Sequence, residues 1–231
     1  MKTTIDAAEL LARLRARANP ANVAGMARYG INTRNALGVP MPFMRALAKQ
    51  TLRDHATAAA LWESGVHEAR ILATLIEEPV RVTSRQMDRW ARDFDSWDVC
   101  DQACANLFRY LPCAFAKAAE WARAKPEFVR RAGFSLMAGL VVKAKTAPDT
   151  DFEAFLPLIV EASTDPRNMV KKAVNWALRA IGKRNPALQR KAIRTAESIY
   201  RIDSPSARWI ASDALRELRA ASRTAPSRSR L

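Results

Sequence analysis

The sequence predicts an all-α protein, a curved α-solenoid in which antiparallel helix pairs are stacked. Amphipathic stretches of 10 to 18 residues follow one another along the chain, with short breaks between them. No segment shows the alternation of apolar and polar residues that marks a half-buried strand. Related segments recur at intervals of 30 to 41 residues, which is typical of helical-hairpin repeats.

Capping residues, glycine and proline predict the helix boundaries. Asp6 precedes an amphipathic helix that ends near Asn19-Pro20, and a second helix runs from there to Gly30. Residues 30–42 form the longest predicted loop, because their glycines and prolines cannot continue a regular helix. The next helix begins at Pro42. Further helices are expected near residues 55–64, 66–78, 83–94, 96–110, 112–124, 127–145, 150–163, 168–184, 186–201 and 205–220.

Five of the recurring segments place a charged residue just before a small or apolar run. These residues are Arg70, Asp101, Arg131, Lys172 and Arg208. In stacked helical hairpins the second helix of each pair lines a shared surface, so the five residues are expected to form a row along it. Four of them are basic, and Asp101 is the exception.

The charge of the chain indicates a polyanionic partner. The net charge is +15, and the segment 167–231 holds 16 Lys and Arg against 4 Asp and Glu. Nucleic acid is the first candidate and a membrane surface the second, since such a surplus of charge repels itself unless it is neutralised. For any single Arg or Lys, the alternative is a solvated end of an amphipathic helix. We expect residues 1–220 to form one domain and residues 221–231 a basic, disordered tail.

Several other classes of protein are disfavoured. The beginning of the chain lacks the apolar core of a signal peptide, and no run of about 18 apolar residues exists to span a bilayer. Cys100, Cys104 and Cys113 leave one thiol unpaired in any disulfide scheme, so we expect buried thiols in a cytoplasmic protein. His55 and His67 are isolated, which disfavours a histidine triad or zinc site.

The stretch from Ser96 to Cys104 is the main candidate site. Trp97 and Asp101 are four residues apart and therefore lie on one face of a helix. A carboxylate beside an indole is suited to holding a cation, whereas a tryptophan at core spacing is usually a packing residue. We expect such packing of Trp62, Trp90, Trp121 and Trp209.

Three segments, in this order and at compatible spacing, resemble the AlkD-type DNA alkylation repair family, which comprises DNA glycosylases built from HEAT-like helical repeats. The resemblance covers most of the chain. Its most specific segments are Ser96-Trp97-Asp98-Val99-Cys100-Asp101, Phe128-Val129-Arg130-Arg131-Ala132-Gly133, and Val170-Lys171-Lys172-Ala173-Val174-Asn175-Trp176-Ala177-Leu178-Arg179 followed by Lys183-Arg184-Asn185-Pro186.

The resemblance implies a monofunctional glycosylase of base-excision repair, which removes cationic N3- and N7-alkylated purines from duplex DNA without extruding the base into a pocket. It implies that Asp101 is the catalytic carboxylate and that Trp97 and Trp176 contact the lesion-bearing nucleotide. Arg131 matches the basic residue that supports the acid and contacts the DNA backbone. Arg130 takes this role if the register is shifted by one residue. The implied partner is double-stranded DNA with alkylated bases, for a monomer that needs no cofactor, metal or membrane.

The residue types fit this chemistry. Alkylation at N3 or N7 gives the purine a positive charge, so the base leaves without a general acid, and the barrier lies in the oxocarbenium-like charge on the sugar. Asp101 can stabilise that charge and orient the attacking water. Arg131 would keep the acid ionised, and the indoles would attract the cationic nucleotide. No lysine nucleophile is evident, so no nicking of the abasic product is expected.

Further basic residues are expected to contact DNA, and one position departs from the family pattern. The family has a polar residue in the loop ahead of the third helix, where this chain has Pro40. Two other functions stay open: a non-catalytic HEAT-repeat protein that binds bent, branched or damaged DNA, and a protein-interaction solenoid for acidic partners. The expected DNA-binding residues are Arg70, Arg130, Lys171, Lys172, Arg179, Lys183, Arg184 and Arg208.

Overall fold

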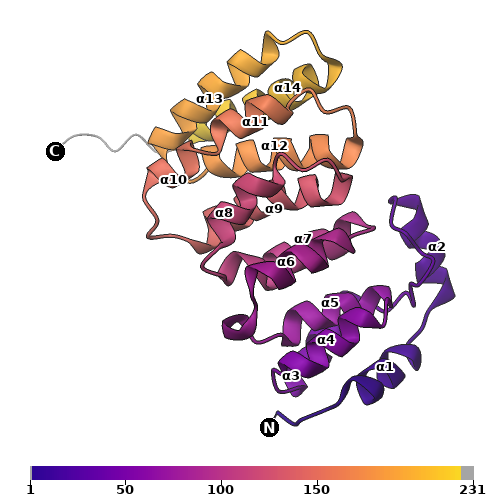
Figure 1. The fold of residues 1–231 in the computed structure, drawn as a ribbon. Helices are drawn as coiled ribbons and strands as arrows, with labels where there is room; N and C mark the ends of the chain where they lie inside the picture. Colours follow the sequence, from indigo (N-terminus) through magenta and orange to yellow (C-terminus); the bar gives the residue numbers. More distant parts are fainter. Residues whose placement is uncertain (1, 225–231) are drawn as a thin grey trace. The chain divides into compact units, whose positions relative to one another are not determined.

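The computed structural model describes residues 2–224, and these fold into α-helices and short 3-10 helices without a strand (Figure 1). The all-α prediction is confirmed. The elements are α1 (Ala7–Arg15), α2 (Pro20–Arg28), α3 (Met41–Gln50), α4 (His55–Glu63), α5 (His67–Ile76), η1 (Pro79–Arg81), α6 (Ser84–Arg92), α7 (Trp97–Asn106), η2 (Phe108–Tyr110), α8 (Ala114–Trp121), α9 (Glu127–Lys143), α10 (Asp149–Glu153), α11 (Leu156–Ala162), α12 (Asn168–Gly182), α13 (Pro186–Tyr200) and α14 (Pro205–Thr224).

Side-chain caps explain why many helices begin where the sequence predicts. The Asp6 carboxylate accepts a hydrogen bond from the backbone N–H of Glu9 at 2.8 Å, ahead of α1. Asn19, Asp54 and Asn185 cap α2, α4 and α13 in the same way. Each cap satisfies backbone donors that the first turn of a helix leaves unpaired.

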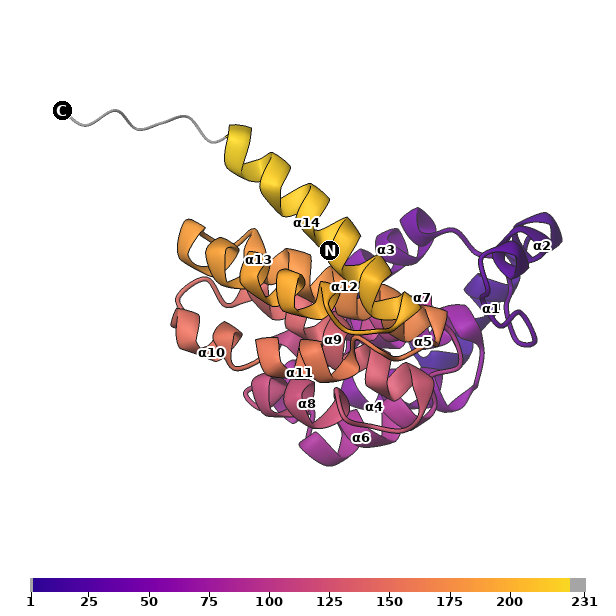
Figure 2. The same ribbon diagram turned by 90° about the horizontal axis from the view of Figure 1, so that it is seen from above.

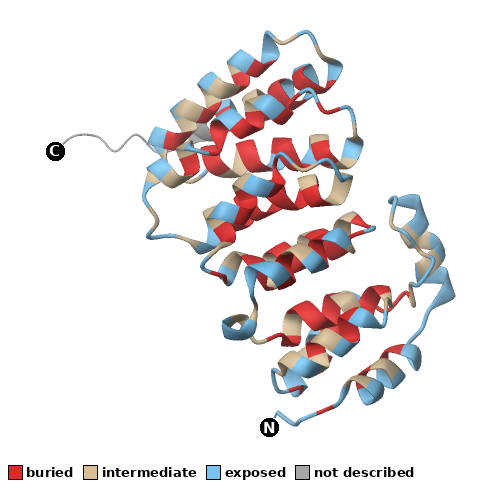
Figure 3. Ribbon diagram, viewed as in Figure 1, coloured by how far each residue is buried: buried red, intermediate tan, exposed pale blue. Residues whose placement is uncertain are grey.

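The residues form two compact units, and the first extends to Ala114. In it, α4 packs against α5, and α5 also contacts α3 and α7. Trp62 of α4 stacks on Trp90 of α6 with a ring-centroid distance of 4.1 Å and nearly parallel planes. Both rings are buried, which confirms that they are packing residues. Helix α2, in contrast, buries no residue and is drawn as exposed or intermediate in Figure 3.

The loop between α2 and α3 is fixed by a buried acid. Glu68 of α5 is 1% exposed, and its carboxylate accepts hydrogen bonds from the backbone N–H groups of Leu37 at 2.8 Å, Gly38 at 2.6 Å and Val39 at 3.2 Å. Gly38 has φ +76°, and a Cβ there would lie 2.3 Å from the carbonyl oxygen of Asn19. The segment before Pro40 therefore has a defined conformation.

The second unit begins at Phe115. Helix α12 packs against α9, α11, α13 and α14, and α13 lies along α14 (Figures 1 and 2). Helices α8 and α9 approach closely at Gly133, where a Cβ would lie 2.5 Å from the backbone nitrogen of Ala122. The Phe115, Phe152 and Phe155 rings cluster with centroids 5.6 to 6.5 Å apart.

Some predicted boundaries differ from the structure. The helix expected over 150–163 is divided into α10 and α11, because Pro157 lacks the N–H that would continue the helical ladder. The helix expected over 96–110 ends at Asn106 and is followed by η2. Helix α14 continues to Thr224, beyond the predicted end at residue 220. The predicted tail, 221–231, lies outside the described residues from 225 onward, and the assignment of 1–220 to one domain stays a prediction.

Within residues 2–224, no helix is long and apolar enough to cross a bilayer.

Candidate nucleic-acid interface

Helix α7 carries Trp97 and Asp101 one helical turn apart. Its buried side is formed by Val99, Cys100 and Ala103. Trp97 and Asp101 are both half-buried, so they lie at the edge of the surface and not in the core. The predicted pairing of an indole and a carboxylate on one face of a helix is therefore present.

The start of α7 is held by the segment that follows α2. The indole Nε1–H of Trp97 donates to the carbonyl oxygen of Tyr29 at 3.0 Å. The backbone N–H of Asn32 donates to the Ser96 hydroxyl at 2.8 Å, and the Asn32 amide donates to Asp95 at 2.8 Å. These contacts fix the orientation of the Trp97 ring from outside its own helix.

Asp98, the other acid in the first half of α7, is paired with a histidine. His67 Nε2 lies 2.8 Å from Asp98 Oδ2, and His67 is only 5% exposed. Burial of the imidazole tends to lower the pKa of His67, but the hydrogen bond to Asp98 and the nearby charges of Asp98, Glu68 and Asp95 raise it above its usual value. Asp98 is therefore paired with a histidine of α5.

In the second unit, the two neighbouring arginines of α9 have different partners. Arg131 is 6% exposed, and its guanidinium donates to the carbonyl oxygen of Met169 at 2.6 Å, next to the start of α12. Arg130 donates to the carbonyl oxygen of Ala122 at 3.0 Å and forms an ion pair with Asp165 at 3.0 Å. Arg130 therefore ties α8, α9 and the segment before α12 together, while Arg131 contacts α12. The role of each in catalysis stays a prediction.

Two exposed tryptophans lie on α12 and α14. Trp176 is 38% exposed and Trp209 is 41% exposed. The Lys171 ammonium lies 4.9 Å from the centroid of the Trp209 ring, within the range of a cation–π contact. The prediction that Trp209 is a packing residue is wrong, whereas Trp121 is buried as expected. Trp176 and Trp209 present aromatic surface that a nucleic acid can reach.

The residues predicted to bind DNA divide into two groups by their protein contacts. Lys171 and Lys172 make no ion pair with an acid of residues 2–224, and Lys172 is exposed. Arg179 and Lys183 both bind Glu217, and Lys183 first and then Arg179 lower the pKa of that carboxyl. The lysine pair is therefore better placed to neutralise phosphates.

Three other arginines of this set stabilise the protein itself. The Arg70 guanidinium donates to the carbonyl oxygen of Asp93 at 3.0 Å and stacks over the Trp62 ring. Arg184 donates to the carbonyl oxygens of Lys145 at 2.9 Å and Ala147 at 2.8 Å. Arg208 pairs with Asp203 at 2.7 Å on the surface. These contacts occupy groups that the sequence alone assigned to DNA.

The helix boundaries also revise the predicted row of charged residues. Asp101, Arg131 and Lys172 are each the fifth residue of their helix, but Arg70 and Arg208 are the fourth. Because each residue of an α-helix is rotated by about 100° from the last, a shift of one moves a side chain to another face. The fifth residues of α5 and α14 are Ile71 and Trp209. Ile71 is buried and Trp209 is exposed, so the same position in two helices does not have the same exposure.

The chain is similar to known proteins over most of its length. The model of a family described as DNA alkylation repair enzyme matches residues 10–220. A solved structure described as a new family of proteins related to the HEAT-like repeat DNA glycosylases, with affinity for branched DNA structures, has a TM-score of 0.78 at 18% identity and covers 94% of this chain and 95% of its own. No curated protein matches.

Two artificial proteins are more distantly similar. An engineered protein has a TM-score of 0.40 at 14% identity, covering 77% of this chain and 90% of its own. A designed armadillo repeat protein has a TM-score of 0.37 at 15% identity, covering 76% and 91%. The first of the three solved structures shows that the fold is that of the HEAT-like repeat proteins.

Proposed function

The chain belongs to the DNA alkylation repair enzyme family, and on that premise we propose that it is a monofunctional DNA glycosylase for purines alkylated at N3 or N7 in duplex DNA. The observation that carries the proposal is the arrangement on α7. Asp101 and Trp97 share a half-buried face, Trp97 is held by Tyr29, and the neighbouring Asp98 is bound to His67. We assign Asp101, which shares the half-buried face of Trp97, to the reaction.

The reaction consists of the replacement of one bond by another at the sugar. The bond between C1′ and the purine nitrogen breaks, and the purine leaves with the electron pair, which neutralises the charge that alkylation placed on the base. A water oxygen bonds to C1′ and releases a proton. The products are a free alkylated purine and an abasic site. Because the leaving group is already cationic, this step needs no general acid.

Asp101 acts on the charge that develops on the sugar. A carboxylate beside C1′ is attracted to the oxocarbenium-like transition state more strongly than to the neutral sugar of the bound substrate, which lowers the barrier. Removal of one such preorganised group typically costs about 100- to 1000-fold in rate. Asp101 can also accept a hydrogen bond from the attacking water and so orient it.

The aromatic and basic side chains bind the DNA. An indole face attracts a cationic base by roughly 0.5 to 2 kcal/mol, and we assign this role to Trp97 and Trp176. Trp209, exposed beside Lys171, is a further aromatic contact for the nucleic acid. Lys171 and Lys172 bind phosphates, a contribution that weakens as salt rises, because phosphate binding releases counterions. We also assign a contact with the DNA backbone to Arg131.

A base-release assay tests the proposal. Duplexes containing 7-methylguanine or 3-methyladenine are incubated with the wild type, and free base is separated from DNA by chromatography. We expect release of free alkylated purine and an abasic product whose strand is intact until it is treated with alkali. Undamaged duplex is the control and should yield no base. Binding of both damaged duplexes without release above the spontaneous rate would contradict the proposal.

A non-catalytic DNA-binding protein is the second candidate. It is favoured by the similar structure whose description gives affinity for branched DNA, and by Pro40 at a position where the family has a polar residue. Pro40 is exposed and directly precedes α3, whose start has no side-chain cap. This candidate predicts that the wild type binds a four-way junction more tightly than a linear duplex of equal length and releases no base from either.

A further inference from the structure

A pocket between α3 and α5 in the first unit is lined mainly by cations. Its volume is about 260 Å³, and its charged lining residues are Lys2, Arg45, Lys49 and Arg53. Ala48 and Leu75 complete the wall, and no acidic side chain lines it. The volume is below the range of about 300–1,000 Å³ that is typical of pockets for drug-sized molecules. The chemistry of the lining is that of a site for a small anionic group.

The protein itself leaves these cations largely uncompensated. Among residues 2–224, the side chains of Lys2, Arg45 and Lys49 have neither an ion-pair nor a hydrogen-bond partner. Arg53 donates to the backbone carbonyl oxygen of Glu77 at 3.1 Å. Four positive groups around one small cavity repel one another, and a bound anion removes this repulsion.

The nearby acid Glu77 does not fill this role, because its carboxylate is used elsewhere. One oxygen lies 2.9 Å from His55 Nδ1, and the other accepts a hydrogen bond from the Gln86 amide at 2.8 Å. Glu77 therefore offers Arg53 only its backbone carbonyl. The charge of the pocket is available to a ligand.

Backbone contacts hold the lining in place. The N–H of Thr3 donates to the carbonyl oxygen of Gln50 at 2.9 Å, and the N–H of Leu52 donates to the carbonyl oxygen of Thr3 at 2.9 Å. This bridge places Lys2 beside the end of α3. Arg45 and Lys49 are one helical turn apart on α3, so their side chains lie on one face. The cations come from three separate segments that the fold brings together.

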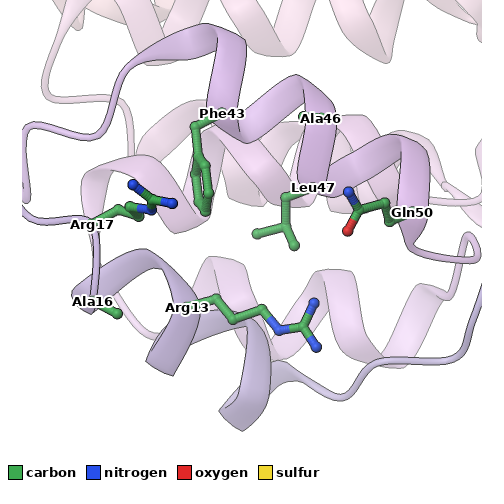
Figure 4. Close-up of a pocket in the computed structure, with 7 residues that line it drawn as sticks. All are labelled: Arg13, Ala16, Arg17, Phe43, Ala46, Leu47 and Gln50. Carbon is green, nitrogen blue, oxygen red and sulfur yellow. The ribbon is translucent and has the colours of Figure 1, made fainter.

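The pocket on the other side of α3 has a different character. Arg13, Arg17, Phe43 and Leu47 are among its lining residues (Figure 4). There Arg13 is paired with Glu9 at 2.8 Å, and the Arg17 guanidinium lies 5.3 Å from the centroid of the Phe43 ring, facing it in Figure 4. Its arginines already have partners within the protein. The pocket between α3 and α5 has four cations and no acid in its lining, and three of these cations have no partner within residues 2–224.

We propose that the pocket formed by Lys2, Arg45, Lys49 and Arg53 binds a backbone phosphate of the DNA. This inference rests on the DNA-binding part of the proposed function. Helix α5 packs against α3 on one side and against α7, the helix of Asp101, on the other. The pocket therefore belongs to the same packed layer of helices as the acid. A phosphate held here gives the first unit a grip on the DNA backbone that is separate from the lesion contacts.

The salt dependence of DNA binding tests the inference. The affinity of the full chain for an undamaged duplex is measured by fluorescence anisotropy at several salt concentrations. The slope of log affinity against log salt is negative. In the double variant Arg45→Gln/Lys49→Gln its magnitude should fall by about 1, which is the loss of about one phosphate contact. If both proteins bind equally at 1 M salt, the variant then binds about tenfold more weakly than the wild type at 0.1 M salt. Lys2→Gln alone should lower the magnitude of the slope by a smaller amount.

The matched control is Arg85→Gln/Arg89→Gln. These two arginines are exposed and have the same four-residue spacing on α6, so the control removes the same formal charge away from the pocket. We expect the control to leave the slope at its wild-type value. Equal slopes in all three proteins, or equal losses in both variants, would overturn the inference. Thermal melting by circular dichroism identifies any variant that is unfolded.

Inorganic phosphate tests whether the ligand of the pocket is DNA or a small free anion. If phosphate raises the melting temperature of the wild type but not of the pocket variant, at matched ionic strength, and the DNA slope is unchanged, then the DNA assignment is wrong. The proposed catalysis is tested separately by base release. A wild type that releases no base refutes the glycosylase, while the slopes on undamaged DNA still decide the phosphate site. A wild type that binds no DNA overturns both.

Discussion

Substitution of Glu68 by Gln should destabilise the first unit by about 2–4 kcal/mol. The carboxylate is buried and accepts three backbone hydrogen bonds, from Leu37, Gly38 and Val39. A glutamine amide has one oxygen to accept and an NH₂ group that faces donors, so at least one buried N–H loses its acceptor. An unsatisfied buried donor costs about 1–3 kcal/mol, and the remaining bonds lose their charge assistance, which contributes about a further 1 kcal/mol.

Urea unfolding followed by circular dichroism measures this loss. The midpoint should fall while the slope of free energy against urea stays the same, since the surface exposed on unfolding is unchanged. Glu63→Gln, at an exposed acid near the end of α4, is the control and should change the free energy of unfolding by less than about 0.5 kcal/mol. A loss below about 1 kcal/mol for Glu68→Gln would refute the view that this carboxylate fixes the loop before Pro40.

Three other predictions concern separate features. The raised pKa of His67 means that its pair with Asp98 stabilises the fold fully below the ordinary histidine pKa of about 6.5 and less as pH rises through the folded-state pKa. Wild type should therefore lose stability relative to His67→Gln as pH is raised above about 6.5 in urea titrations, and equal pH profiles would contradict this. Gly133→Ala should cost about 1–3 kcal/mol in thermal or urea unfolding, because the new methyl would lie 2.5 Å from the backbone nitrogen of Ala122, directly after α8, and a neutral effect would show that α8 and α9 can separate easily. Trp209→Ala should weaken DNA binding about 5- to 100-fold in anisotropy if a base stacks on the ring, with a melting temperature near that of wild type; unchanged affinity would remove Trp209 from the interface.

Much of the fold could be predicted because helix boundaries are set by local chemistry. The caps at Asp6, Asn19 and Asn185 each satisfy backbone donors a few residues away, and such signals are visible in a short window of sequence. Pro157 is also a local signal of this kind, since it divides the helix expected over 150–163. The surface position of Trp209 has no such local signal, because Ile71 and Arg131 are also the fifth residues of their helices and are buried.

The contacts around the candidate site could not be predicted in this way. His67 and Asp98 are 31 residues apart, and Trp97 and the Tyr29 carbonyl are 68 residues apart. Such pairs depend on how helices pack, which no local pattern specifies. The same reason explains Arg70, whose charge suggested DNA but whose guanidinium binds the Asp93 carbonyl. The sequence therefore indicates candidate residues by their type and position, but not the partner that each one contacts.

The rate of base release by Asp101→Asn is the most direct test of the proposed chemistry. Single-turnover release of 7-methylguanine is measured with the variant in excess over a duplex it has already bound, so that binding and chemistry are separated. The substitution keeps the size of the side chain and removes its charge. We predict a fall of about 100-fold or more in the rate, with DNA affinity within a few-fold of wild type. Release at the wild-type rate would contradict the assignment of Asp101 as the catalytic carboxylate.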